Sequence, residues 1–172
     1  MEAHPITADS MIPGILRMLP LTILLYACGE TDSRPEAEPD SEIPFRVDGS
    51  LDFVRADSVR FSIAIEIAES DSARERGMMQ RTSFPSESGM LFVFDDVQIR
   101  HFWMGNTPLS LDLIFIGTDG AIVDFSKYAT PFSDEGIESR APAQHVLEVP
   151  AGFVDSQGIV EGDQIRWRRT GE

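Results

Sequence analysis

The clearest candidate for chemistry in this chain is an aspartate inside an apolar run. Asp112 interrupts Leu111–Ile116, and period-two alternation places it on the same face as two isoleucines of that run. A carboxylate half buried on that face needs a partner. The polar residues available nearby are Arg81, Asn106 and Thr107. Asp112 is then expected either to accept backbone N–H bonds from the turn that contains Asn106 and Thr107, or to pair with Arg81 and fix a corner of the core.

The same side chains also predict a polar cleft for a small ligand. Arg81 would bind a carboxylate or phosphate through two parallel hydrogen bonds. Trp103 would supply a stacking face. Asn106 would orient the ligand, with Thr107 and Asp112 beside it. These five residues form the predicted ligand site.

An enzyme of unknown reaction using the Arg81/Trp103/Asp112 cleft is an alternative function. Serine-histidine-aspartate catalysis would need a serine near a histidine, but the chain has no Gly-x-Ser-x-Gly motif. Asp95 and Asp96 are adjacent, so on a strand they point to opposite faces and cannot act as a pair. We therefore assign no catalytic residue.

Soft-metal binding is a second alternative, because thioether ligands select Cu(I). On a regular strand His101 and Met104 point to opposite faces, so one ion could not bind both without a bulge. Methionine is more often core filler. No spacing of ligands predicts zinc or calcium, so no cofactor is expected. The residues considered for copper are His101, Trp103, Met104, Met78, Met79 and Met90.

Short strands separated by turn signals dominate the rest of the chain. The helix signals are few: Ser72 and Glu75 have capping-box spacing before Gly77, and Gly158 could end one turn over 152–157. The pattern predicts a mainly β, single-domain sandwich or barrel with one or two short helices. The expected strands are Leu51–Arg55, Val59–Ala68, Met90–Phe94, Gln98–Met104, Leu111–Ile116, Ala121–Phe125, His145–Val149 and Asp163–Arg168, with tight turns at Ala56-Asp57 and Gly117–Gly120.

Several motifs over about 58–167 resemble the domain of unknown function 192 family. They are Arg76–Arg81, Gly89–Phe94, Phe102–Thr107, Leu111-Asp112, Val146–Gly152 and Gly162-Asp163, in the family's order and spacing. The resemblance implies a compact, jelly-roll-like β domain with a short helix, often exported, with no established biochemical activity. Gly105 departs from the pattern, because a basic residue is common there.

The single cysteine, Cys28, predicts a lipid anchor. It ends an apolar run over 18–28, which is too short to cross a bilayer but has the length of a signal-peptide core, with Arg17 before it. Leu25-Tyr26-Ala27-Cys28 resembles the lipobox of bacterial lipoproteins. We expect a signal peptide over 1–27, with a true start at Met11, then lipidated Cys28 and a disordered acidic tether over 28–44, and a globular domain over 45–172.

The chain is strongly acidic, with a formal net charge of −15. Removal of 1–27 leaves 13 basic and 27 acidic residues, a charge of about −14. Such a surface repels phosphate backbones and anionic headgroups, so nucleic-acid partners are not expected and the acyl chains are the expected contact with the membrane. We therefore expect an exported, membrane-anchored lipoprotein that faces the periplasm or exterior, with a domain that binds a small ligand or acts as an accessory envelope module.

Overall fold

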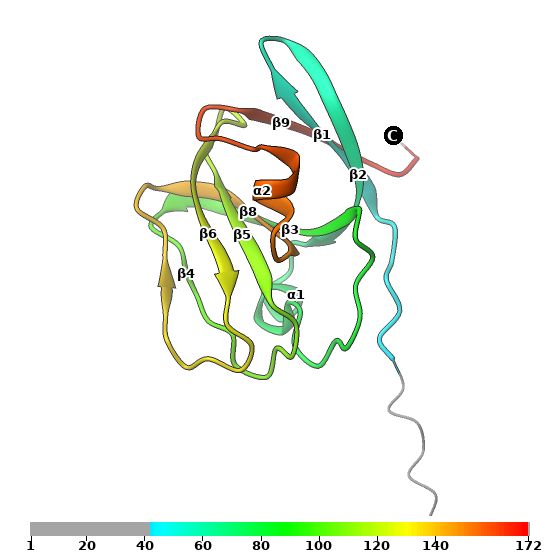
Figure 1. Cartoon of the computed structure of the whole chain (residues 1–172), viewed down its shortest axis with the longest axis vertical. Helices are drawn as coiled ribbons and strands as arrows, with labels where there is room; N and C mark the ends of the chain where they lie inside the picture. Colours follow the sequence, from blue (N-terminus) through cyan, green and yellow to red (C-terminus); the bar gives the residue numbers. More distant parts are fainter. Residues whose placement is uncertain (1–41, 172) are drawn as a thin grey trace, which may run out of the picture. The chain divides into compact units, whose positions relative to one another are not determined.

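The computed structural model describes residues 42–171, so Cys28 and the predicted signal peptide lie outside the described residues. The described chain folds into nine strands and two short helices (Figure 1). The elements are β1 (Gly49–Arg55), β2 (Ser58–Ala68), α1 (Asp71–Arg76), β3 (Ser88–Gln98), β4 (His101–Phe102), β5 (Leu111–Ile116), β6 (Ile122–Ala129), β7 (Ile137–Glu138), β8 (Ala143–Pro150), α2 (Phe153–Gln157) and β9 (Gln164–Arg169).

Seven of these strands form one mixed sheet in the order β6-β5-β8-β3-β2-β1-β9, and β4 pairs with β7 in a second, small sheet. Only β2 and β3 run parallel in the large sheet, and α1 lies in the connection between them. The two edge strands approach each other through one isolated bridge between Ala121 and Gln164. This confirms the mainly β class with short helices, and the large sheet is not a closed barrel.

Local turn chemistry accounts for the β1–β2 hairpin, which projects from the rest of the sheet in Figure 1. Ala56 and Asp57 both have positive φ values, 49° and 58°. A two-residue turn of this kind matches the right-handed twist of the strands that it joins. The hairpin predicted from the sequence is therefore confirmed.

The predicted start of the first helix needs a correction. Ser72 lies inside α1, and Ser70 is the N-cap, because its side chain accepts the Ala73 N–H. Gly77 ends the helix at a φ of 46°, where a β-carbon would also crowd Phe92. The second helical turn ends at Gly158, as expected.

Both faces of the central strands are buried, so neighbouring residues contribute to different core clusters. On β8, Val146 belongs to one cluster and Leu147 to the other. The first cluster includes Leu51, Phe53, Ile65, Leu91, Ile114, Leu147, Val149, Phe153 and Val154. The second includes Met78, Met90, Phe92, Met104, Leu111, Leu113, Phe115 and Val146. α2 thus packs on the first face, whereas the segments that carry Met78 and Met104 cover the second.

One expected strand is much shorter than predicted. Of 98–104, Gln98 ends β3 and only His101–Phe102 forms a separate strand, which pairs with β7 instead of the large sheet. The buried Arg100 side chain holds the corner before it, since it donates to the Ala143 and Asp96 carbonyls.

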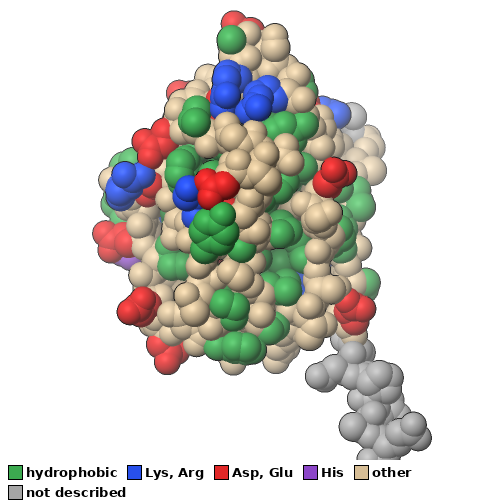
Figure 2. Space-filling view, in the orientation of Figure 1, with side chains coloured by type: hydrophobic (Ala, Val, Ile, Leu, Met, Phe, Trp, Pro, Cys, Tyr) green, Lys and Arg blue, Asp and Glu red, His purple; other side chains and the backbone are tan. Residues whose placement is uncertain are grey.

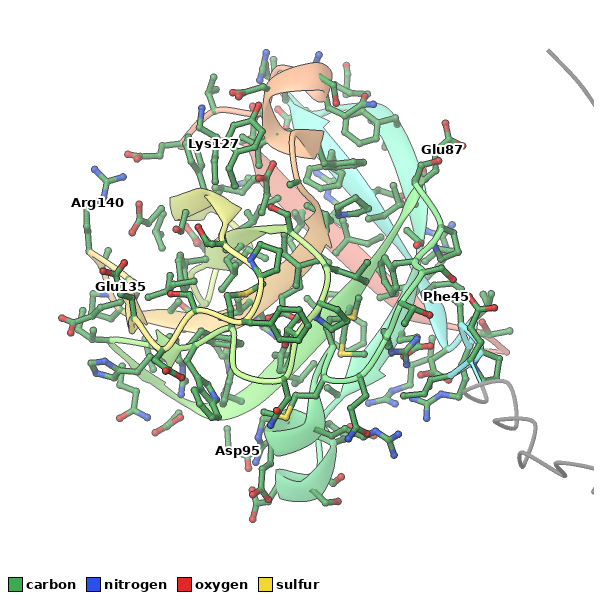
Figure 3. All side chains as sticks on the ribbon, turned by 60° about the horizontal axis from the view of Figure 1, so that its bottom comes forward. Phe45, Glu87, Asp95, Lys127, Glu135 and Arg140 are labelled. Carbon is green, nitrogen blue, oxygen red and sulfur yellow. The ribbon has the colours of Figure 1, made fainter. Side chains whose placement is uncertain are left out.

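Charged side chains such as Glu87 and Arg140 point outward (Figure 3). Within 42–171 no helix is long and apolar enough to cross a membrane.

Candidate functional site

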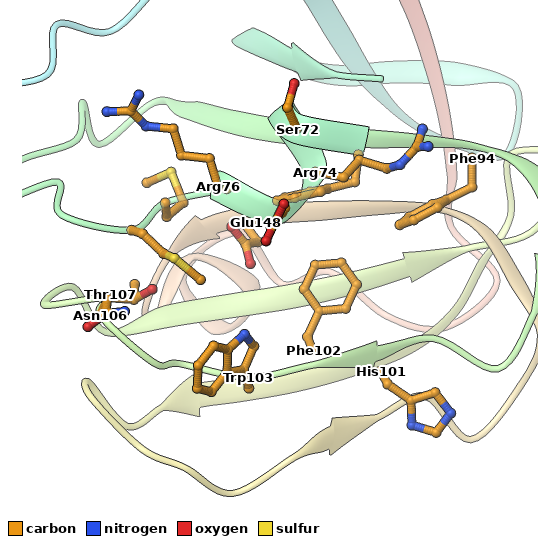
Figure 4. Close-up of a pocket in the computed structure, with 15 residues that line it drawn as sticks. Ser72, Arg74, Arg76, Phe94, His101, Phe102, Trp103, Asn106, Thr107 and Glu148 are labelled. Carbon is orange, nitrogen blue, oxygen red and sulfur yellow. The ribbon is translucent and has the colours of Figure 1, made fainter. Parts of the chain in front are cut away.

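An open groove of about 740 Å³ lies on the second face of the sheet (Figure 4). We call it the α1 groove. One wall is α1 with the turn that follows it, and the opposite wall is the chain at 101–107. Side chains of β3 and β8 form the floor. The lining residues are Ser72, Arg74, Glu75, Arg76, Gly77, Met78, Met79, Phe92, Phe94, His101, Phe102, Trp103, Asn106, Thr107 and Glu148.

The lining is rich in aromatic side chains. Phe92 and Phe102 meet edge to face, with ring centroids 5.1 Å apart. Trp103 is 51% exposed, a large apolar side chain at the rim of the groove. Its ring lies against Gly105, since a β-carbon at Gly105 would come within 2.2 Å of the indole. The missing side chain at this position therefore allows the indole to fold over the backbone.

Glu148 is the unusual group of this groove. It lies in the middle of the sheet, between Met90 of β3 and Leu113 of β5. Only 5% of the residue is exposed, and among the described residues its Oε2 atom has no hydrogen-bond partner. Burial among apolar side chains raises the pKa of Glu148 to about 8. At neutral pH it is therefore mostly a protonated acid, at the centre of the groove (Figure 4).

The two arginines of α1 differ in availability. Arg74 donates to Asp71 and to the Val93 carbonyl, and its guanidinium lies over the Phe94 ring. Arg76 is exposed, and no residue in the described range forms an ion pair with it. Arg76 is therefore a cationic side chain at the rim that is not engaged in an ion pair with the described residues.

A second depression of about 530 Å³ continues from the α1 groove. Arg76 and Asn106 line both. Asn106 has a positive φ of 57°, and its carbonyl accepts the Gln80 N–H, which holds the two walls together at this point. An occupant longer than a single ring therefore has room to extend past Arg76. The other lining residues of this depression are Glu42, Ile43, Gln80, Thr82, Pro108 and Phe132.

Three of the five residues predicted to bind a ligand line the α1 groove: Trp103, Asn106 and Thr107. Arg81 does not line it. Arg81 is buried and donates to the Glu66 carboxylate at 2.6 Å, from Nη2 to Oε2. Glu66 in turn accepts the Arg46 backbone N–H, so this ion pair fixes a corner of the fold.

Asp112 lies on the opposite face of the sheet, with the first core cluster. It is fully buried, and it accepts the backbone N–H groups of Tyr128 at 2.8 Å and Val154 at 3.0 Å. Val154 is in the first turn of α2, whose N-cap is Gly152, so Asp112 supplies the cap that glycine lacks. The expected partners were wrong, because the hydrogen-bond donors to Asp112 are Tyr128 and Val154 and not Arg81 or the turn at Asn106.

Glu148 was missed as a site residue, although a signal for it existed. It interrupts an apolar strand, Val146–Val149, just as Asp112 interrupts its own. Alternation separates it from Leu147 and Val149 and directs it to the other face. The same test that selected Asp112 would have selected Glu148.

Four of the six residues considered for copper line the α1 groove: His101, Trp103, Met78 and Met79. Met78, Met90 and Met104 are buried in the second core cluster. His101 is exposed and lies 3.3 Å from the Glu138 carboxylate. The structure as described, over 42–171, contains no group of three or more His, Cys, Asp or Glu residues placed to hold a metal ion.

Solved structures of two bacterial proteins are similar to this chain. One, from Sinorhizobium meliloti 1021, is described as a candidate transcription regulator; it is 34% identical, with a TM-score of 0.68 over 73% of this chain and 97% of its own. The other, from Novosphingobium aromaticivorans, is of unknown function and is 27% identical, with a TM-score of 0.67 over 81% of this chain and 100% of its own. No curated protein matches. The family model DUF192, described as "Uncharacterized ACR", matches residues 53–167. This chain therefore belongs to the DUF192 family.

Proposed function

We propose that this protein is an exported lipoprotein whose globular domain binds a small molecule in the α1 groove, as an accessory module of the cell envelope. The observation that carries the proposal is Glu148, a buried carboxyl group with an unpartnered oxygen at the floor of an open groove. A buried polar atom without a partner is costly, by about 1–3 kcal/mol. A ligand that satisfies this atom recovers that free energy on binding.

The rest of the groove suits a small ligand. Aromatic side chains provide apolar contact, and a few polar groups, among them Asn106 and Thr107, can orient the bound molecule. Concave sites with this mixture and a titratable group of shifted pKa are typical ligand or active sites. Lipidation of Cys28 would hold such a module at the membrane surface.

Catalysis in the same groove has less support. A protonated Glu148 could act as a general acid, but its partners in such chemistry are not in place. His101 is exposed and already close to Glu138. Asp112 and Arg81, the other members of the predicted cleft, do not line this groove.

DNA binding, which the description of the Sinorhizobium meliloti relative would suggest, is disfavoured by charge. The chain carries a formal net charge of −15. On the face shown in Figure 2, acidic side chains are scattered and the basic ones occur in small groups. Several arginines of the described residues are ion-paired, such as Arg168 with Asp52. Affinity for nucleic acid comes largely from lysines and arginines that neutralise phosphates and release their counterions.

Binding can be tested with three probes that share one aromatic ring and differ in head group: benzyl alcohol, benzylamine and benzoate. We expect at least one to shift the two-dimensional NMR signals of α1, of 101–107 and of Glu148 in the purified protein, with saturation at millimolar concentration or below. Glu148→Gln and Trp103→Ala should weaken that binding. Glu87→Gln, which alters an exposed carboxylate outside the groove, is the matched control. Absence of saturable shifts with all three probes would contradict the proposal.

A further inference from the structure

The carboxyl group of Glu148 lacks a positively charged partner among the described residues. In the described part of the chain, no lysine, arginine or histidine pairs with it. Its Oε2 atom is buried and unpartnered, and the side chain points into the groove (Figure 4). A buried carboxylate becomes stable when a cation with N–H donors reaches it. The place that such a cation would take beside Glu148 is open to the groove.

The aromatic lining supplies the second type of contact that cations use. Trp103 and Phe102 flank the floor, and the quadrupole of an aromatic ring attracts positive charge at its face. Rings at this end of the groove already hold cations in the fold, because Arg74 and Arg100 both lie over Phe94, at 5.2 Å and 3.8 Å. The strongly acidic chain also steers cations toward itself.

The charged groups around Glu148 are engaged elsewhere or exposed, and none of them pairs with its carboxyl group. On the α1 wall, Arg74 is engaged with Asp71, whereas Glu75 and Arg76 are exposed to solvent, where salt screens their fields. On the opposite wall, His101 lies beside Glu138. On the sheet, Met90 and Leu113 flank Glu148, and beyond Met90 the Glu66–Arg81 pair is internally neutral.

We propose that the α1 groove binds an organic ammonium cation, with its charged nitrogen on the Glu148 carboxylate and its carbon skeleton against Phe102 and Trp103. This inference rests on the proposed function and names the ligand class of the same site. A primary ammonium group fits best, because it can donate hydrogen bonds to an oxygen that has no other donor.

Binding of such a cation is coupled to loss of a proton. At neutral pH the free protein holds Glu148 as the acid. When the ammonium ion arrives, the Glu148 O–H bond breaks, the proton passes to the buffer, and N–H···O hydrogen bonds form with the carboxylate. One cation is bound and up to one proton released, so the net charge of the groove is unchanged. The affinity should therefore rise as the pH rises toward 8.

The test is titration calorimetry on the purified protein with benzylamine, benzyl alcohol and benzoate at pH 7, in phosphate and in Tris. Benzylamine should bind at least about tenfold more tightly than either other probe. The measured heat should differ between the two buffers by the amount expected for release of nearly one proton. The affinity for benzylamine should rise about tenfold per pH unit between pH 6 and pH 7.5 and level off above pH 8.

Two variants separate a site effect from a folding effect. Glu148→Gln should lose the preference for benzylamine and the proton release while it keeps the native circular dichroism spectrum. Glu87→Gln, which removes an exposed carboxylate outside the groove, should retain both. If benzyl alcohol or benzoate binds as tightly as benzylamine, or no proton is released, the cation inference is wrong while groove binding stands. If no probe binds, the inference and the proposed function both fail.

Discussion

Two buried carboxyl groups on neighbouring strands of one sheet have opposite environments. Asp112 on β5 accepts two backbone N–H groups on one face, so its oxygens are satisfied within the fold. Glu148 on β8 lies on the other face, with an oxygen that has no partner among the described residues. Burial without hydrogen bonds favours the neutral form of an acid. Asp112 therefore has a structural role, whereas Glu148 has an oxygen that is free to accept a hydrogen bond from a ligand.

The raised pKa of Glu148 makes stability depend on pH in a specific direction. The folded state holds the proton up to about pH 8, whereas the unfolded chain releases it near 4.5. Between these values the folded state binds more protons, so the contribution to stability is full below about pH 4.5 and is lost as the pH rises to 8. The slope is at most about 1.4 kcal/mol per pH unit.

Glu148→Gln removes this titration. The free energy of unfolding of the variant, relative to that of the parent protein, should therefore increase as the pH rises from 5 to 8. Urea unfolding of both proteins at several pH values measures the difference. Effects common to both cancel, among them the pKa of His145, which burial lowers. Glu87→Gln, at an exposed carboxylate without a titrating partner among the described residues, should give a flat difference. A flat difference for Glu148→Gln as well would mean that the carboxyl group is ionised in the folded state.

Substitution of Asp112 tests whether this second buried carboxyl group has a structural role. Asp112→Ala leaves the N–H groups of Tyr128 and Val154 without their acceptor, which should lower the free energy of unfolding by roughly 2–5 kcal/mol. Asp112→Asn retains one acceptor oxygen and should lose less. Thermal and urea unfolding measure both. Because Asp112 faces away from the α1 groove, Asp112→Asn should leave probe binding unchanged, and loss of binding without loss of stability would overturn this assignment.

For single residues, the sequence predicted which side chains are buried better than it predicted their hydrogen-bond partners. Strand alternation correctly made Asp112 a buried residue, because alternation is a local property of a strand. Its partners lie 16 and 42 residues away, on β6 and α2. No spacing in the sequence specifies such contacts. Arg81 illustrates the same limit, since its partner Glu66 is on β2.

Among the elements, α1 is the one that shapes the site. It carries one wall of the α1 groove, and none of its residues is fully buried. A six-residue helix is too short to be stable by itself. Its caps and its contact with the sheet must therefore hold it. Gly77 permits that contact, because its φ of 46° and its missing side chain leave room for Phe92.

The N-cap of α1 gives a prediction at this scale. Ser70→Ala removes the acceptor of the Ala73 N–H and should lower the free energy of unfolding by about 1 kcal/mol, with faster hydrogen exchange in α1. Ser70→Asp should restore the cap. Ser72→Ala, at the residue that the sequence favoured as the cap, should have little effect. Equal losses for Ser70→Ala and Ser72→Ala would show that Ser70 is not the main cap.

Elements with local signals were predictable, and their arrangement was not. The turn at Ala56-Asp57 and the helix end at Gly158 depend on backbone conformations that single residues select. The parallel pairing of β2 with β3, with α1 between them, depends on contacts across the whole sheet. The expected strand over 98–104 failed because Arg100 bonds to the Ala143 carbonyl and turns the chain.

For the whole molecule, charge and anchoring act on different parts of the chain. The acidic surface disfavours contact with anionic headgroups. If Cys28 is lipidated as predicted, its acyl chains must hold the protein at the membrane without help from the domain.

Cys28→Ser tests that arrangement. Two or more acyl chains hold a protein firmly at a membrane, and their loss leaves no electrostatic attraction in this acidic chain to replace them. The variant should therefore move from the membrane fraction to the soluble fraction, and mass spectrometry of the parent protein should find the acyl chains on Cys28. Ser33→Ala, in the same predicted tether, should remain with the membrane. A Cys28→Ser protein that stays bound after a high-salt wash would require an apolar contact with the membrane other than acyl chains on Cys28.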